Sequence, residues 1–385
     1  MNFPTNLNRP LFQRGHFKYP RSLSELIKMT SVRATRLAVG AAALAWLPAL
    51  ALSSLLGLVS LKSFLFDLAA ETRLLVVIPL LILTEPLLMA RLSAIAQHFL
   101  DAELIKNEEI SRFERALTDF KNRENSLIAK VLIVLIVYIV VASTITNISR
   151  GLLPPWCYET GFNLSAAGSW YLLVSLPIVL YLLLRWVWRQ LLWSLFLRSV
   201  ARMDLRLVAA HPDRLGGLGF LETCVRGYFP FGFAIGAIVA GRVANQMLHQ
   251  HESVMTYKHT PLVVIAVVLP ICLAPLGAFV GQLVRTRLRG TFEYGNLALF
   301  LGHQFEKKWL HADKESAASI LTASDFSATI DLYSVVANVR EVRAFPISLQ
   351  SVLRLTAATL VPAIPVMLLA VPFDVLLERL LKLLL

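Results

Sequence analysis

Two groups of residues have the types and spacing to act on ions, and the first is a carboxylate within an apolar segment. Glu85 lies in TEPLLMAR, and by the helical rise it is roughly 16 Å deep in a span. A carboxylate at that depth needs a partner or water. Arg185 and Arg242 fall within roughly 8 Å of the same depth. Together the three residues predict a charged path for protons or ions, and the alternative is a buried structural ion pair or a protonated Glu85.

The second group is the loop HPDRLGGLGF, residues 211–220. Pro212 disfavours helix at the residue before it, and the glycines can adopt positive φ. A glycine-rich loop that opens a helix directs N–H groups towards an anion. We therefore predict an anion-binding loop at the cytoplasmic face, formed by His211, Asp213, Arg214, Gly216, Gly217 and Gly219. The alternative is a tight turn in which Asp213 is a cap and Arg214 meets lipid headgroups.

Enzyme, metal and cofactor signatures are not found in the sequence. It has no H-E-x-x-H, G-x-S-x-G or Walker pattern. Its three cysteines, Cys157, Cys224 and Cys272, include no C-x-x-C pair, and the histidines lack ligand spacing. We therefore expect no catalytic residue, no cofactor, no metal site and no disulfide.

The composition indicates that lipid solvates much of this chain. Of 385 residues, 56% are hydrophobic and only 16% are charged, whereas a soluble domain has about 25% charged residues. Several apolar runs reach the roughly 20 residues that cross a bilayer. We predict an all-α fold, a polytopic bundle of about seven transmembrane helices with a small helical cytoplasmic layer. The predicted spans are 36–61, 74–92, 130–148, 169–188, 227–247, 261–284 and 352–373.

The distribution of basic residues gives the predicted orientation. With the N-terminus in the cytoplasm, the four inner segments hold 30 Lys and Arg residues and the three outer segments hold four. That asymmetry is typical of cytoplasmic loops, and an odd number of spans then places the C-terminus outside. The net charge of +12 is explained in the same way, so we expect anionic lipid headgroups as partners and no nucleic acid. Assembly with copies of the same chain is an alternative that the sequence leaves open.

The chain divides into segments according to these spans. The predicted order begins with a basic cytoplasmic N-terminal segment, spans one and two, and a cytoplasmic amphipathic helix that continues span two. These are followed by spans three to six with the glycine-rich loop, a cytoplasmic helical segment, and span seven with an interfacial C-terminal helix. Ile110, Phe113, Leu117 and Phe120 form the apolar stripe of the amphipathic helix, which we expect to pack on the same subunit. The boundaries are 1–35, 36–92, 93–129, 130–284, 285–350 and 351–385.

Three stretches resemble a family of bacterial multi-span inner-membrane proteins: HPDRLGGLGFLE, EYGNLALFLGHQFEKKWL and VREVRAFPISLQSVLRLTAATLVPAIPVMLL. The resemblance covers roughly the second half of the chain. It implies a location in the bacterial inner membrane and carries over no activity and no functional residue.

Three functions from different classes follow from these patterns. The first is a channel or transporter-like protein with Glu85, Arg185 and Arg242 along its path and the glycine-rich loop at its entrance. The second is a membrane enzyme acting on a phosphorylated lipid at the inner face, with His211, Asp213 and Arg214 in its site. The third is a non-catalytic scaffold or sensor that uses its cytoplasmic helices.

Overall fold

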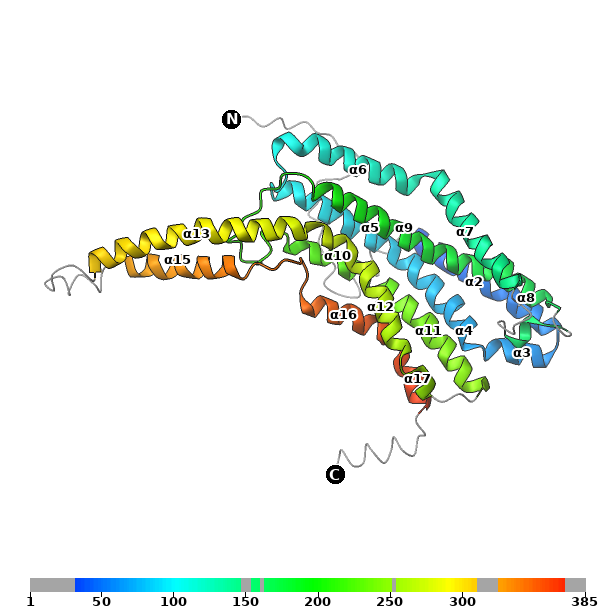
Figure 1. Cartoon of the computed structure of the whole chain (residues 1–385). Helices are drawn as coiled ribbons and strands as arrows, with labels where there is room; N and C mark the ends of the chain where they lie inside the picture. Colours follow the sequence, from blue (N-terminus) through cyan, green and yellow to red (C-terminus); the bar gives the residue numbers. More distant parts are fainter. Residues whose placement is uncertain (1–31, 147–153, 160–162, 251–253, 310–324, 371–385) are drawn as a thin grey trace, which may run out of the picture.

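The computed structural model describes residues 32–146, 154–159, 163–250, 254–309 and 325–370, and every regular element in these ranges is helical (Figure 1). The predicted all-α fold is therefore confirmed. Most of the predicted basic N-terminal segment and the predicted C-terminal interfacial helix lie outside the described residues.

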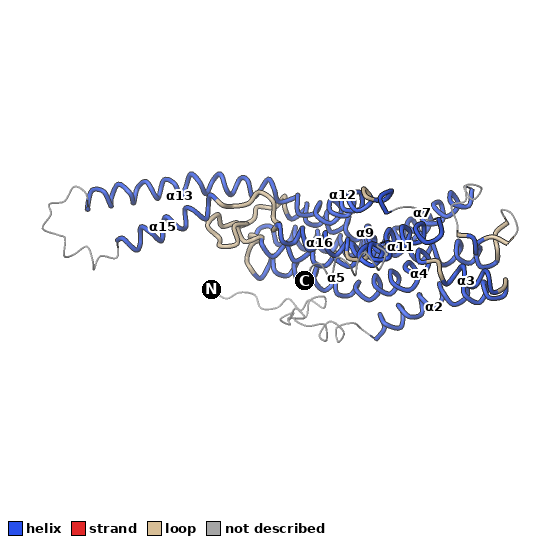
Figure 2. The backbone as a smooth tube through the Cα atoms, turned by 90° about the horizontal axis from the view of Figure 1, so that it is seen from below, coloured by secondary structure: helices blue, strands red, loops and turns tan. Residues whose placement is uncertain are grey.

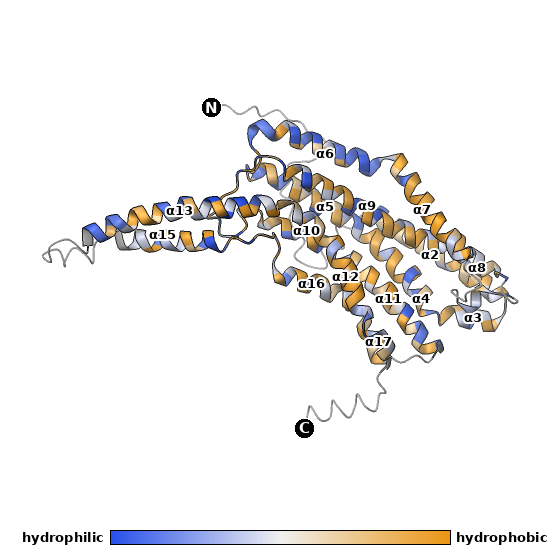
Figure 3. Ribbon diagram, viewed as in Figure 1, coloured by the Kyte–Doolittle hydropathy of each residue, from blue (hydrophilic) through white to orange (hydrophobic). Residues whose placement is uncertain are grey.

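Six helical runs among the described residues are long and apolar enough to cross a membrane. The surface of the third run shows why lipid must solvate it: on α7 (Leu127–Thr146) Ile133, Val137 and Val141 are buried, whereas Ile128 and Ile139 are exposed. Apolar residues run along the helices of the bundle (Figure 3), and many large apolar side chains are exposed on them. The chain is a multi-pass membrane protein, with six runs at Val32–Leu55, Leu68–Asp101, Leu127–Thr146, Ala166–Val200, Gly219–His249 and Met255–Lys307.

The second and fourth runs each contain a π-helical segment next to a proline. In the second run, α4 (Leu68–Glu71) continues through the π segment Thr72–Val77 into α5 (Ile78–Asp101), which has Pro79 in its first turn. The fourth run has the same order: α8 (Ala166–Trp170), the π segment Tyr171–Ser175, then α9 (Leu176–Val200) with Pro177. A proline cannot donate a backbone hydrogen bond and clashes with the carbonyl four residues earlier. The wider π turns accommodate that carbonyl in both helices.

The predicted amphipathic continuation of span two over 93–129 is wrong in one respect. The helix α5 ends at Asp101, the chain reverses, and α6 (Ile110–Asn125) runs back along the bundle into α7. Glu103 has φ 51° in this reversal, and the Arg206 N–H donates to the Leu104 carbonyl. The expected packing on the same subunit is confirmed, because the Phe113 and Phe120 rings contact Phe196 of α9.

The bundle is organised around α11 (Phe229–Gln250), which follows the short α10 (Glu222–Gly227). It packs against α4, α5, α12 (Thr260–Leu273), α16 (Leu349–Leu360) and α17 (Ala363–Ala370). It approaches α16 most closely at Gly236, where an added Cβ would lie 1.9 Å from the Thr359 carbonyl oxygen. Arg242, on the opposite face, lines a cavity.

The seventh predicted span consists of two helices, α16 and α17, divided at Val361 and Pro362. Ser351 near the start of α16 donates to Glu222, and Met367 of α17 shares a small cavity with Met247 of α11. The pair therefore accompanies α11 along most of its length, and by the helical rise it covers roughly 30 Å. A broken helix has unpaired backbone groups, so it needs protein on at least one side at membrane depth.

A helical hairpin extends beyond one end of the bundle. It consists of α13 (Val280–Trp309) and α15 (Asp325–Arg340), which lie side by side (Figures 1 and 2). We call this end the basic end, because α6, the loop 201–218 and the arginine-rich start of α13 gather there. The opposite end holds α3 (Leu58–Leu65), α8 and the last turn of α11. Cys157, Cys224 and Cys272 are buried and free.

Candidate functional site

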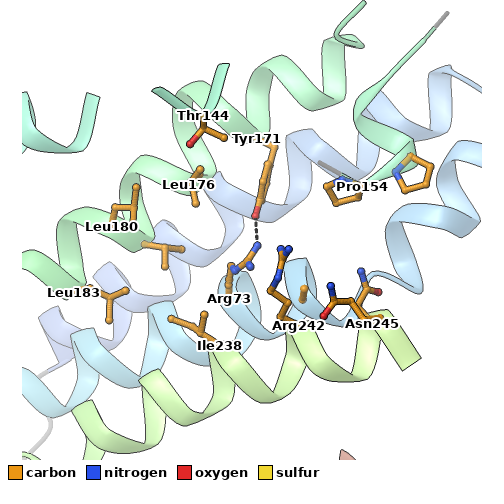
Figure 4. A pocket seen from close by; sticks show the side chains of 14 residues that line it. Arg73, Thr144, Pro154, Tyr171, Leu176, Leu180, Leu183, Ile238, Arg242 and Asn245 are labelled. Atoms are coloured by element: carbon orange, nitrogen blue, oxygen red, sulfur yellow. Dashed lines mark hydrogen bonds between the residues drawn. The ribbon is translucent and has the colours of Figure 1, made fainter. Parts of the chain in front are cut away.

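A cavity of about 430 Å³ lies between α4, α7, α9 and α11, towards the end opposite to the basic end (Figure 4). Its walls are apolar near Leu183 and Ile238. Towards its other end it is lined by side chains that can donate hydrogen bonds, and no lining residue is Asp or Glu. These donors are Arg73, Thr144, Tyr171, Arg242, Asn245 and Gln246.

The two π-helical segments meet in the wall of this cavity. The Arg73 Nη1 donates to the Tyr171 hydroxyl at 2.7 Å, and each residue belongs to one of the two segments (Figure 4). A π turn carries an extra residue, which rotates the following side chains relative to a regular helix, and such turns occur often at functional sites. Here the two prolines and their π turns determine where Arg73 and Tyr171 point.

Arg242 is the second cation of the cavity. Its side chain is drawn beside Arg73 in Figure 4, and Asn245 follows on the next turn of α11. Arg242 is exposed, and no described residue forms a salt bridge with it. A guanidinium in contact with hydrocarbon is costly, so this cavity has to contain water or a ligand.

Asp67 and Glu71 lie on the neighbouring turns but form no salt bridge with the arginines, and the Asp67 charge acts on Arg73 only through space. Asp67 caps α4 through the N–H groups of Ala69 and Ala70, and its other oxygen accepts from the Trp156 indole at 2.9 Å. Glu71 accepts from the Trp46 indole at 2.9 and 3.0 Å. Among the described residues, Arg73 and Arg242 therefore make no ion pair, and the cavity is both positively charged and rich in donors.

Glu85 belongs to a separate cluster of four charged residues. Its Oε1 accepts from Nη2 of Arg185 and from Nη2 of Arg189, both at 2.7 Å, and Arg189 Nη2 also donates to Glu124 Oε1 at 3.0 Å. The predicted pair of Glu85 with Arg185 is confirmed. Arg242, the other predicted partner, is replaced by Arg189, whose side chain is only 1% exposed.

Glu85 also lies farther along its helix than the predicted mid-membrane depth. The helical run begins at Leu68 rather than at residue 74, so Glu85 lies roughly 25 Å along it. Its arginine partner Arg189 also binds Glu124, in the last turn of the polar helix α6, just before the apolar α7 begins. The cluster thus joins α5, α6 and α9 near the basic end.

The glycine-rich loop binds a carboxylate of its own. Asp213 accepts from the N–H groups of Leu215 at 2.8 Å, Gly217 at 3.2 Å and Gly219 at 2.8 Å. The chain turns through positive φ at Arg214, Gly216 and Gly217. The expected donor geometry is therefore present, but the structure gives the Gly217 and Gly219 donors an internal partner. His211 Nδ1 lies 2.8 Å from Asp213, and Arg214 pairs with Glu341.

The Asp213 carboxylate stabilises the loop, with a pH dependence of known sign. Burial disfavours its charged form, but the three backbone N–H groups, with a smaller contribution from the His211 side chain, outweigh burial and lower the pKa of Asp213. Such a group stabilises the fold above its unfolded pKa of about 4, and this stability is lost as pH falls through the lower folded pKa.

We expect Asp213→Asn to open this loop at neutral pH. An amide cannot accept all three N–H bonds with the strength of a carboxylate, and charged hydrogen bonds contribute roughly 1.5–3 kcal/mol each. Hydrogen exchange at residues 215–219 should therefore be at least about tenfold faster at pH 7. The control His211→Ala removes a neighbour that is 43% exposed and should change exchange by less than about threefold. Unchanged exchange in Asp213→Asn would contradict the role of the carboxylate.

The donor-rich lining of the cavity is of a kind that can bind an anion. Its donors surround a water-accessible space, and among the described residues no group of three His, Cys, Asp or Glu side chains could hold a metal ion. The sequence singled out Arg242 only. Arg73 was assigned to an outer loop, and the signal that could have placed it inside a helix is Asp67, a good helix cap one residue before Leu68.

Comparisons of the chain with protein-family models, with curated proteins and with solved structures find no match. The resemblance to a bacterial inner-membrane family stays a prediction.

Proposed function

We propose that this membrane protein binds a small anion in the cavity between α4, α7, α9 and α11 and carries it across the bilayer. The observation that supports this proposal is the pair Arg73 and Arg242, two arginines in one cavity with no carboxylate in its lining. Fixed donors aimed at a water-accessible space replace the hydration of an anion at low cost. Residual positive charge also attracts anions and repels cations.

A transporter fits this cavity better than an open channel. The lining ends at Leu183 on α9 and at Ile238 on α11, and both are apolar. The four-residue cluster of Glu85, Arg185, Arg189 and Glu124 ties the helices together at the basic end. A site closed on one side is what alternating access requires of one state. In this proposal Arg189, bound to Glu85 and Glu124, holds the closed side together, with Arg185 as a weaker partner of Glu85. Arg242 and Arg73 bind the anion.

The test is anion flux into proteoliposomes by Arg242→Gln and Arg73→Gln. Each variant removes one guanidinium from the cavity and leaves a shorter, uncharged polar side chain. Losing one charged hydrogen bond costs roughly 1.5–3 kcal/mol of binding free energy. The anion concentration that gives half-maximal flux should therefore rise at least about tenfold, for whichever of chloride, nitrate or phosphate the wild type carries. Lys62→Gln is the matched control, because Lys62 is an exposed cation of α3 outside the cavity. Flux that is equal in wild type and both arginine variants would reject the proposal.

One observation favours a second function, a scaffold that acts through the hairpin of α13 and α15. The exposed side of α13 carries Leu288, Phe292, Leu299 and Phe300, and exposed apolar groups of this size often mark a partner site. A scaffold predicts no flux at all and loss of a partner on Phe292→Ser. The lipid-enzyme alternative has less support, because both oxygens of Asp213 are bound by the backbone of its own loop.

A further inference from the structure

A groove at the basic end carries a second concentration of positive charge, separate from the anion cavity. It has a volume of about 670 Å³ and lies between the chain after α9, residues 201–207, and the first turns of α13. Three arginines line it, Arg202 from the first segment and Arg285 and Arg289 from α13. Arg285 and Arg289 are four residues apart, so they share one face of the helix.

The acids near this groove leave most of that charge uncompensated. Asp204 is the acidic residue of the lining, and it forms a salt bridge with Lys106. Arg289 faces Glu293 at 3.8 Å, but both side chains are 63% exposed, and exposed pairs of this length contribute little. The formal charge of the lining, with three arginines and one aspartate, is +2, and because Asp204 pairs with Lys106 it does not neutralise the arginines directly.

The groove is held in shape before any ligand arrives. Gln282 of α13 donates from Nε2 to the carbonyl oxygens of Ala201 and Met203, both at 2.8 Å, so the amide fixes the segment after α9 against the helix. Gly281, one turn before Arg285, leaves open space: a Cβ built there would meet no atom within 4 Å. A ligand can therefore approach the backbone of α13 directly below the two arginines.

We propose that this groove binds a phosphate monoester group with two negative charges. Guanidinium groups match phosphate oxygens with paired hydrogen bonds, and the excess charge of the lining equals that of a monoester. A phosphodiester headgroup has one negative charge and would leave the groove half-neutralised. A phosphate monoester group occurs both in a lipid such as phosphatidic acid and in a small soluble phosphate ester. The groove lies at the basic end, where basic residues can contact either kind of ligand.

Native mass spectrometry of the full-length protein in detergent can test this with three probes: dioleoyl phosphatidic acid, dioleoyl phosphatidylglycerol and glycerol 3-phosphate. We expect the wild type to bind a monoester at least about tenfold more tightly than phosphatidylglycerol. Binding of phosphatidic acid alone would identify a lipid site, and binding of glycerol 3-phosphate alone a site for soluble esters. Equal binding of both lipids with no binding of glycerol 3-phosphate would overturn the proposal.

The variants Arg285→Gln and Arg289→Gln separate the groove from general surface charge. Each should weaken monoester binding at least about tenfold. Arg287→Gln is the matched control, because Arg287 is an exposed arginine of the same helix outside the lining, and it should change affinity by less than about twofold. Arg202→Gln provides the same test from the other wall if a variant of α13 fails to fold. An equal loss in Arg287→Gln and Arg285→Gln would show nonspecific attraction and reject the site.

Discussion

Arg189→Met is expected to lower the free energy of unfolding by about 3–5 kcal/mol, because removing one member of a buried ion pair leaves an uncompensated charge. Arg189 is 1% exposed and contributes the single nitrogen that binds both Glu85 and Glu124. Without it Glu124 loses the salt bridge that ties α6 to α9, while Glu85 keeps only Arg185. The measurement is unfolding of the purified protein by titration with sodium dodecyl sulfate in mixed micelles.

Arg185→Met is the matched control for this prediction. Arg185 binds the same Glu85 oxygen at the same distance of 2.7 Å, but its side chain is 35% exposed. Solvent can screen and replace a pair of this kind, so the expected loss is about 1 kcal/mol or less. Equal losses in the two variants would mean that burial of Arg189 does not decide its contribution. The cluster would then not be the tie between α5, α6 and α9 that holds the basic end closed.

The sequence predicted the membrane class and the order of helices well, because a bilayer imposes length and apolarity on every span. It predicted the pair of Glu85 and Arg185 by comparing depths along helices. The same reasoning selected Arg242 instead of Arg189, because it started the second span at residue 74 and placed Glu85 too near the middle. The depth of a residue counted along a helix is wrong by as much as the assigned start of that helix is wrong. The start is determined by caps such as Asp67 rather than by hydropathy.

Other features depend on contacts that no local pattern contains. The reversal after α5 runs through AELIK, which has no proline or glycine to mark it. It is fixed instead by tertiary contacts with the chain after α9: the Arg206 N–H donates to Leu104, and Ile105 pairs with Leu205. The loop at Asp213 shows the converse case, since its glycines and their N–H donors were recognisable but their internal partner was not. The cavity between α4, α7, α9 and α11 depends on two π turns, each next to a proline.

The packing of α11 against the broken seventh helix leads to the other large expected effect. A Cβ on Gly236 would lie 1.9 Å from the Thr359 carbonyl oxygen, and one on Gly232 would lie 2.6 Å from the Thr359 hydroxyl. The hydroxyl can rotate, but the carbonyl belongs to the backbone of α16 just before the break at Pro362. Adding a methyl group at Gly236 must therefore push α16 away from α11.

We expect Gly236→Ala to destabilise the protein by at least about 1–3 kcal/mol, the usual cost of overpacking, although alanine favours helix over glycine by about 1 kcal/mol. Gly295→Ala in α13 is the matched control, because nothing lies within 4 Å of its added Cβ, and it should be neutral or stabilising. The same micelle titration measures both variants. A neutral Gly236→Ala would contradict the close packing of α16 on α11. Because α11 carries Arg242 on its other face, a shift of α11 relative to α16 in Gly236→Ala should also weaken the proposed anion binding in the cavity. Gly295→Ala should not reproduce this loss of binding.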